Sequence, residues 1–346
     1  MPSFCRHNRL IQNCTICSRE LEIEARPIVS SGKPGLSAPR PAGGAGRGGA
    51  RGGQGTGSAG SGGGARAQGR TRAPARAGGV SVRRLARGAE DGYQSALVPG
   101  LKSSADADRL ASELAFAAVR LELLADDPPG LIAEVAAAGD VEERTWLAFQ
   151  IVYICPLDDD RPFASIEAAR TTWASGELPD VDAVKLGPRS PHEPGRGVAT
   201  LAAYRAWAAR ASSQALAFGG EASWTPERRF ARVFERLALP GMHRDARYDL
   251  LVVLGRTGVY ELRGGALQLV GDNDTTVAAK RALGIGDTLL LDRRAAELAE
   301  ACEVPLESLD LALYNWGIGR RVRLGVPAGV EPSLQDVERI QAALGL

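Results

Sequence analysis

A long segment rich in glycine, alanine and arginine restricts this 346-residue chain more than any other feature of its sequence. Between Ala25 and Ala89 there is no aromatic residue and there are few large aliphatic ones. Such a segment cannot bury enough apolar surface to offset the conformational entropy that folding removes. We therefore expect residues 25–98 to form a disordered linker, between a short N-terminal unit at 1–24 and a folded domain at 99–346.

The same segment concentrates positive charge. Twelve residues between Ala25 and Ala89 are Lys or Arg, and none is Asp or Glu. Because the whole chain has a formal charge of +1, the rest of it carries −11. A cationic linker can attract a nucleic acid without reading its sequence. It can equally be a passive spacer, and the composition leaves both interpretations open.

A candidate metal site lies at the N-terminus, where three of the five cysteines and one of the three histidines fall within seventeen residues. They form a C-x-H…C-x-x-C pattern whose predicted ligands are Cys5, His7, Cys14 and Cys17. Three thiolates and one imidazole complete a tetrahedral Zn²⁺ site with no position left for water, so the zinc is structural rather than catalytic. A knuckle of this size buries no core, and the metal would supply its folding free energy. The alternative is an unstructured N-terminus with incidental thiols.

The sequence has no apolar N-terminal segment typical of signal peptides and no apolar run long enough to cross a bilayer. Its cysteines do not form a secreted disulfide framework. We therefore expect a cytoplasmic protein with no membrane partner, whose oligomeric state the sequence does not specify.

Apolar residues recur at helical spacing through most of residues 99–346, which predicts a mainly α domain. Residues 146–155 are apolar almost all round, so this helix is expected to be buried at the centre. One segment, 259–270, alternates around Gly264 and Gly265 and predicts a β-hairpin. The expected helices are one that ends before Asp127 and those at 131–138, 142–155, 163–175, 197–218, 227–237, 248–254, 275–283, 292–302, 306–316 and 333–344.

Two amphipathic helical patterns, 227–237 and 248–254, are joined by a Leu-Pro-Gly turn that ends at Gly241. This arrangement is the sequence form of a helix-hairpin-helix. Glycine permits the chain reversal, and backbone N–H groups at the start of the second helix are free to bind a DNA phosphate. Charged residues at this helix start would also meet phosphate, unless they form only a solvated face. The residues expected to contact DNA here are Leu239, Pro240, Gly241, His243, Arg244 and Arg247.

A carboxylate follows the hairpin at the start of the next predicted helix. Asp274 precedes Thr-Thr-Val, and the helix that it opens carries Lys280 and Arg281, which we also assign to DNA contacts. A carboxylate in this place can act in catalysis. Asp is also an ordinary N-cap residue, so a purely structural role is the alternative. Asp272 is the second candidate for the catalytic carboxylate.

Three consecutive carboxylates, Asp158, Asp159 and Asp160, precede the helix that Pro162 opens. Carboxylate oxygens can hold Mg²⁺. An exposed acidic turn at a helix N-terminus is the commoner explanation of such a run, because the helix dipole favours negative charge there.

The hairpin, the carboxylate and the cation-bearing helix, in that order, resemble the helix-hairpin-helix DNA glycosylase superfamily. Over most of residues 100–325 and at the N-terminus, the chain more closely resembles the predicted alpha-glutamyl/putrescinyl thymine pyrophosphorylases of clade 3. The motifs that carry this resemblance are Phe4-Cys-Arg-His-Asn-Arg9, Trp146-Leu-Ala-Phe-Gln-Ile-Val-Tyr153 with Pro156-Leu157, Asp287-Thr-Leu-Leu-Leu-Asp-Arg-Arg294 and Leu309-Asp-Leu-Ala-Leu-Tyr-Asn-Trp316.

The resemblance implies a glycosylase-like helical domain in which a base is flipped out of DNA into a cleft between two helical subdomains. It implies that pyrophosphate on 5-pyrophosphoryloxymethyluracil is replaced by a small-molecule amine such as glutamate or putrescine, with Asp274 as the catalytic carboxylate. Aromatic side chains stack on extruded bases. The residues assigned to the base pocket are Gln150, Tyr314, Asn315 and Trp316.

The sequence departs from the glycosylase pattern in several respects. His243 occupies the position of the second glycine of the family's hairpin. Asp245 occupies the position of the Schiff-base lysine of the bifunctional enzymes, and the absence of a lysine there argues against strand-cleaving lyase activity. No four-cysteine cluster motif follows, and the hairpin lies further from Asp274 than is usual, which the predicted β-hairpin would account for. Two alternatives stay open: a monofunctional glycosylase that excises a modified or damaged base, and a non-catalytic nucleic-acid-binding protein.

Overall fold

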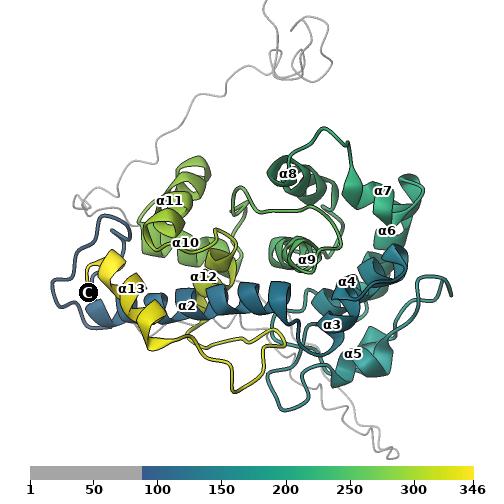
Figure 1. Ribbon diagram of the computed structural model, residues 1–346, viewed down its shortest axis with the longest axis horizontal. Helices are drawn as coiled ribbons and strands as arrows, with labels where there is room; N and C mark the ends of the chain where they lie inside the picture. Colours follow the sequence, from purple (N-terminus) through teal and green to yellow (C-terminus); the bar gives the residue numbers. More distant parts are fainter. Residues whose placement is uncertain (1–87) are drawn as a thin grey trace, which may run out of the picture. The chain divides into compact units, whose positions relative to one another are not determined.

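The computed structural model describes residues 88–346, so the predicted zinc ligands and the predicted linker before residue 88 lie outside the described residues (Figure 1). The prediction of a mainly α domain is confirmed, and the described residues contain no β-strand. No helix among them is long and apolar enough to cross a membrane. The helices are α2 (Ser104–Asp126), α3 (Leu131–Ala136), α4 (Val141–Ile154), α5 (Ala164–Ala169), the 3₁₀ turn η2 (Val181–Ala183), α6 (Gly197–Arg210), α7 (Gln214–Gly219), α8 (Pro226–Arg236), α9 (Arg244–Arg256), α10 (Asp274–Leu283), α11 (Thr288–Ala301), α12 (Ser308–Ile318) and α13 (Leu334–Leu344).

The helices form two groups that share α2 (Figure 1). In one group, α12 and α13 pack on α2, α10 packs on α12, and α11 packs on α10. In the other group, α4 contacts α3, α5, α7 and α9, while α8 contacts α7 and α9, and α6 packs on α7. The long helix α2 runs beneath both groups and also contacts α9. One group is therefore formed by α2 together with α10 to α13, and the other by α3 to α9.

The predicted buried central helix is α4, and this prediction is confirmed. Its residues from Thr145 to Ile154 are buried apart from the half-buried Leu147. The rings of Phe149 and Tyr204 in α6 stack with centroids 3.8 Å apart, and the Trp146 ring contacts both, at 5.3 Å from Phe149 and 5.7 Å from Tyr204. Aromatic side chains bury large apolar areas, so this stack fixes α4 against α6.

Two predicted helices are shorter or divided in the structure. The helix expected at 163–175 ends after Ala169, because Gln150 of α4 binds the backbone N–H of Thr171 at 2.8 Å and its carbonyl at 3.0 Å. The helix expected at 197–218 is divided into α6 and α7. The division comes at Ser212, which has a left-handed φ of 74°, and the Ser213 side chain caps α7.

The predicted β-hairpin at 259–270 is wrong, because backbone groups of this segment bond to side chains of neighbouring helices. The N–H of Leu267 donates to Asp292 at 3.0 Å, and the N–H of Gly264 donates to Glu307 at 2.9 Å. Arg244 donates to the carbonyl of Leu267. A Cβ on Gly264 would lie 2.7 Å from the Tyr248 hydroxyl, so the glycine permits close packing on α9 rather than a hairpin turn.

The packed part of the chain begins before residue 99, where sequence analysis placed the domain boundary. Val98 is fully buried in the core. The Tyr93 hydroxyl donates to the carbonyl of Leu344 in α13 at 2.6 Å, and Asp91 accepts from the N–H of Ser104 at the start of α2. Residues 88–98 thus pack against the first and last helices of the described chain.

Candidate active site

The predicted hairpin is present as α8, a tight turn and α9. Gly241 has a φ of +74°, and a Cβ there would lie 2.3 Å from the Thr200 hydroxyl oxygen in α6, so the turn needs glycine on both counts. The N–H of Met242 donates to the carbonyl of Leu239 at 3.0 Å and closes the turn. No side chain of the described residues caps α9, so its first N–H groups keep their hydrogen-bonding capacity.

Two of the three cations expected to contact phosphate at this helix start are held inside the protein. Arg244 is buried and bonds to Asp310 and to Asp245, which corrects its prediction as a phosphate contact. Arg247 is half-buried, and its Nη1 donates to the carbonyl of Phe234 at 3.1 Å. Both side chains turn back to acceptors within the fold, and only Arg244 is fully buried by doing so.

His243 is the exposed cation-forming side chain of the hairpin, with 59% of its side-chain surface accessible. Its Nε2 lies 3.8 Å from Glu193. The same glutamate pairs at 3.4 Å with Arg196, whose side chain is almost fully exposed beside the start of α6. Sequence analysis did not select Arg196, although it lies in the Pro/Gly-rich loop that packs next to the hairpin. An anionic partner of the hairpin would meet both His243 and Arg196.

Asp274 is exposed and is the first residue of α10. The N-cap is Asn273, whose side chain accepts from the N–H of Thr276 at 2.9 Å. The alternative interpretation of Asp274 as an N-cap is therefore wrong by one residue. Asp272, the second candidate, is 90% exposed and pairs with Lys280 at 3.3 Å.

Tyr314 of α12 lies near the carboxylates at the first turns of both α9 and α10. Its hydroxyl donates to the carbonyl of Pro188 at 3.1 Å. Burial raises the pKa of the phenol to about 12, and the negative charges of Asp274 and Asp245 contribute to the rise. The phenol of Tyr314 is therefore held in its neutral form.

Arg189 occupies the centre of this cluster, although sequence analysis did not select it. Its Nη2 donates to Asp310 at 2.6 Å and to the Thr275 hydroxyl of α10 at 3.5 Å, and lies 3.7 Å from Asp245 of α9. Its guanidinium lies over the Tyr314 ring, with Cζ 4.7 Å from the centroid. One buried arginine thus touches the first turns of both helices.

Buried ion pairs join the two helix groups at the same place. Arg189 and Arg244 share Asp310 of α12, and Arg244 also pairs with Asp245 at 3.0 Å. Burial alone would raise the pKa of Asp310, but the two guanidinium charges outweigh it and lower that pKa. Burial would lower the pKa of Arg189, yet the surrounding carboxylates raise it. Asp310 and Arg189 are therefore held in their charged forms.

Three residues assigned to the base pocket stabilise the fold instead, contrary to the prediction. Gln150 is buried and holds both backbone groups of Thr171. Asn315 is buried and bonds through both atoms of its amide to the backbone of Val322. The indole of Trp316 donates to the carbonyl of Asp106 at 2.9 Å. Their polar groups are used within the core.

Lys280 and Arg281, the predicted DNA contacts on α10, also have partners in the fold. Lys280 pairs with Asp272, as noted above. Arg281 pairs with Asp106 of α2 at 3.3 Å, and its guanidinium lies over the ring of Trp316 at 4.6 Å. Arg281 thereby ties α10 to α2, a structural role that the sequence pattern did not indicate.

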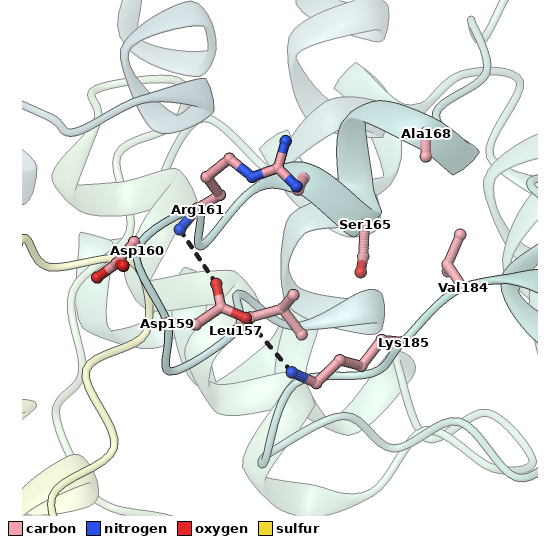
Figure 2. Close-up of a pocket in the computed structure, with 9 residues that line it drawn as sticks. Leu157, Asp159, Asp160, Arg161, Ser165, Ala168, Val184 and Lys185 are labelled. Carbon is pink, nitrogen blue, oxygen red and sulfur yellow. Dashed lines mark hydrogen bonds and ion pairs between the residues drawn. The ribbon is translucent and has the colours of Figure 1, made fainter.

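Two cavities of the described chain border Asp159 and Asp160, and neither is lined by residues of the hairpin. One has a volume of about 690 Å³ and lies between Phe163 and Arg323. The other, of about 470 Å³, is open to solvent. Figure 2 shows Asp159 in this second cavity, bonded to the backbone N–H of Arg161 at 3.1 Å and to Lys185 at 3.3 Å.

The acidic run does not form a metal centre. Asp158 accepts from the backbone N–H of Arg323, while Asp159 is bonded as described above. Within residues 88–346 no group of three or more Asp, Glu, His or Cys side chains converges in a way that could hold a metal ion. The exposed acidic turn is therefore the better explanation of this motif. The four predicted zinc ligands lie outside the described residues.

Comparisons with known proteins add nothing to this geometry: no protein-family model, no curated protein and no solved structure matches the chain.

One residue in the sequence indicates that a buried cation such as Arg189 or Arg244 must be present. Asp310 is the single charged residue of an otherwise apolar helix segment, Leu309–Trp316, and a carboxylate in a buried helix requires a cationic partner. That requirement predicts a buried arginine or lysine without saying which one. Arg189 and Arg244 come from 121 and 66 residues away, distances over which no local pattern acts.

Proposed function

We propose that this protein is a DNA base-modifying enzyme of the helix-hairpin-helix glycosylase type, with Asp274 as its catalytic carboxylate. The observation that carries the proposal is the meeting of two helix starts at one buried arginine. Asp245 in the first turn of α9 lies 3.7 Å from Nη2 of Arg189, and the hydroxyl of Thr275, the residue after the exposed Asp274, lies 3.5 Å from the same nitrogen.

The hairpin is suited to bind a DNA backbone. Free N–H groups at a helix start favour a phosphate, and the positive end of the helix dipole adds to the attraction. The exposed His243 and Arg196 flank the turn and would contact neighbouring phosphates. Such contacts hold the duplex in register without reading its sequence.

The exposed carboxylate of Asp274 supplies the chemistry in this proposal. In base excision it would stabilise the positive charge that develops on the sugar, or activate water. In a replacement reaction on the base it would take a proton from the attacking amine, or stabilise a developing cation. Asp245 stands where a lyase would have its lysine, and a carboxylate cannot form a Schiff base, so strand cleavage is not expected.

The proposed substrate is a hypermodified thymine. The resemblance to the clade 3 thymine pyrophosphorylases favours 5-pyrophosphoryloxymethyluracil, with pyrophosphate leaving and an amine such as glutamate or putrescine taking its place. The base would be extruded from the duplex, since a reacting group inside the stack is covered.

Mass spectrometry of nucleosides tests this proposal. The full chain is incubated with duplex DNA carrying 5-pyrophosphoryloxymethyluracil, with and without glutamate or putrescine, and Asp274→Asn serves as the matched control. An amine-bearing thymidine formed by the parent protein supports replacement, while an abasic site supports a monofunctional glycosylase. DNA that is bound but unchanged by both proteins would leave a non-catalytic nucleic-acid-binding protein as the function.

We also propose that the N-terminus holds one structural Zn²⁺ through Cys5, His7, Cys14 and Cys17, on the strength of their spacing alone. Elemental analysis of the purified chain is expected to give close to one zinc per protein, and Cys14→Ser to lose it, because three ligands hold zinc less tightly than four. A folded protein that is purified without a chelator and contains no zinc would contradict this proposal.

A further inference from the structure

Two buried arginines of the central cluster differ in how completely their nitrogens are bonded. Arg244 donates from Nε to Gln268, from Nη1 to Asp310 and Asp245, and from Nη2 to Leu267. Arg189 is equally buried, with a side chain 4% exposed, but its Nε and Nη1 have no hydrogen-bond partner among the described residues. A buried donor without an acceptor costs free energy, so Arg189 is left ready to bind one.

The position of Arg189 is fixed from several sides. The carbonyl of the preceding residue, Pro188, accepts from the Tyr314 hydroxyl at 3.1 Å. The next residue, Ser190, donates to the carbonyl of Tyr153 at 2.7 Å. The guanidinium itself is held at one end by Asp310. The unpartnered nitrogens are thus presented by an anchored loop.

The charge balance of the cluster indicates what kind of acceptor fits. The positive charges of Arg189 and Arg244 are matched by the negative charges of Asp245 and Asp310. A buried phosphate or carboxylate would add a charge without a counterpart, which is costly away from water. A neutral carbonyl oxygen would satisfy the free donors at no such cost.

We propose that Arg189 is a specificity-determining residue whose free Nε and Nη1 donate to a carbonyl oxygen of the extruded base. The substrate class is then a keto base such as thymine or uracil, read at an edge that carries oxygen. The inference rests on the proposed function, because it requires a base to enter beside Asp274 and Tyr314. Both nitrogens are covered in this structure, so base entry requires the side chains that cover them to move while Asp310 holds the guanidinium.

The test compares two DNA duplexes that differ at one base. One holds a G·T mismatch, and in the other difluorotoluene stands opposite the guanine; this thymine isostere has fluorine in place of both carbonyl oxygens and carbon in place of both ring nitrogens. The affinity of the full chain for each is measured by fluorescence anisotropy. We expect about tenfold tighter binding of the thymine duplex, the effect of one hydrogen bond from a charged donor. Difluorotoluene pairs more weakly and is extruded more easily, which works against the expected preference.

Arg189→Lys keeps the charge that Asp310 requires but removes the two free donors. It is expected to reduce the preference to less than about twofold. His243→Ala is the matched control and is expected to weaken binding of both mismatched duplexes equally.

Equal affinity of the parent protein for the two mismatched duplexes would overturn the inference, and this comparison needs no variant to fold. A full preference retained by Arg189→Lys would overturn it as well. Failure of the parent to bind any duplex would instead refute the proposed DNA function, and the inference with it.

Discussion

The first turns of α9 and α10 both lie at Arg189, yet they treat their charged residues in opposite ways. At α9, Arg244 and Asp245 are drawn inward into ion pairs, and the helix start has no side-chain cap from the described residues. At α10, Asn273 provides the cap and Asp274 is left exposed. The same position on two helices therefore has two different roles. In the first turn of α9 the side chains stabilise the fold, and the backbone N–H groups are left to bind a ligand. In the first turn of α10 a carboxylate side chain is left to bind or react.

The largest expected effect is the loss of the ion pairs at α9. Asp310→Ala removes the carboxylate that Arg189 and Arg244 share and leaves buried positive charge without a counterpart. We expect the free energy of unfolding to fall by about 3–5 kcal/mol in chemical denaturation. The control is Glu134→Ala, which breaks the exposed pair with Arg170 and is expected to cost less than about 1 kcal/mol. If both variants lose a similar free energy of unfolding, the buried ion pairs stabilise the protein no more than the exposed pair does.

Acid is expected to remove part of the same stabilisation. The pKa of Asp310 is lowered in the folded state because the charges of Arg189 and Arg244 outweigh its burial. A lowered carboxyl pKa contributes stability that is complete above the unfolded value and is lost as the pH falls through the folded value. Chemical denaturation between about pH 4 and pH 2 should therefore show a steeper loss of stability for the parent than for Asp310→Asn. Parallel curves would contradict the lowered pKa.

A smaller change in stability is expected at the start of α10, where Asn273 and Asp274 have different roles. Asn273→Ala removes the acceptor for the N–H of Thr276 and is expected to lower the free energy of unfolding by about 1 kcal/mol. Asp274→Asn removes a charge but no cap hydrogen bond, because Asn273 makes that bond, and it is expected to change the free energy of unfolding by less than that. Thermal unfolding of the two variants measures the difference, and the reverse order would return Asp274 to a structural role.

Local patterns predicted the helices well, because the spacing of apolar residues is set by the element itself. The buried α4 and the turn at Gly241 were both predicted from such spacing and from turn chemistry. The segment 259–270 was mispredicted because its N–H groups bond to Asp292 and Glu307, which lie 25 and 43 residues further along the chain. Hydrogen bonds to residues so distant in the sequence determine this segment's conformation, although its alternating apolar pattern favours strands.

The site was predicted only in part for the same reason. Asp274 was selected through a family resemblance, and it stands exposed at the start of α10. Arg189 could not be selected, since a single arginine in a Pro/Gly-rich loop carries no periodic signal. Arg244 was taken for a surface residue because the partner that buries it, Asp310, is 66 residues away.

The measurement that tests the central claim most directly is the single-turnover rate of Asp274→Asn on a DNA substrate that the parent protein converts. The substitution keeps the size of the side chain and removes its charge. We expect a folded protein that binds DNA as the parent does and reacts at least about a hundredfold more slowly, while Asp272→Asn stays close to the parent. Full activity of Asp274→Asn would contradict the assignment of this carboxylate.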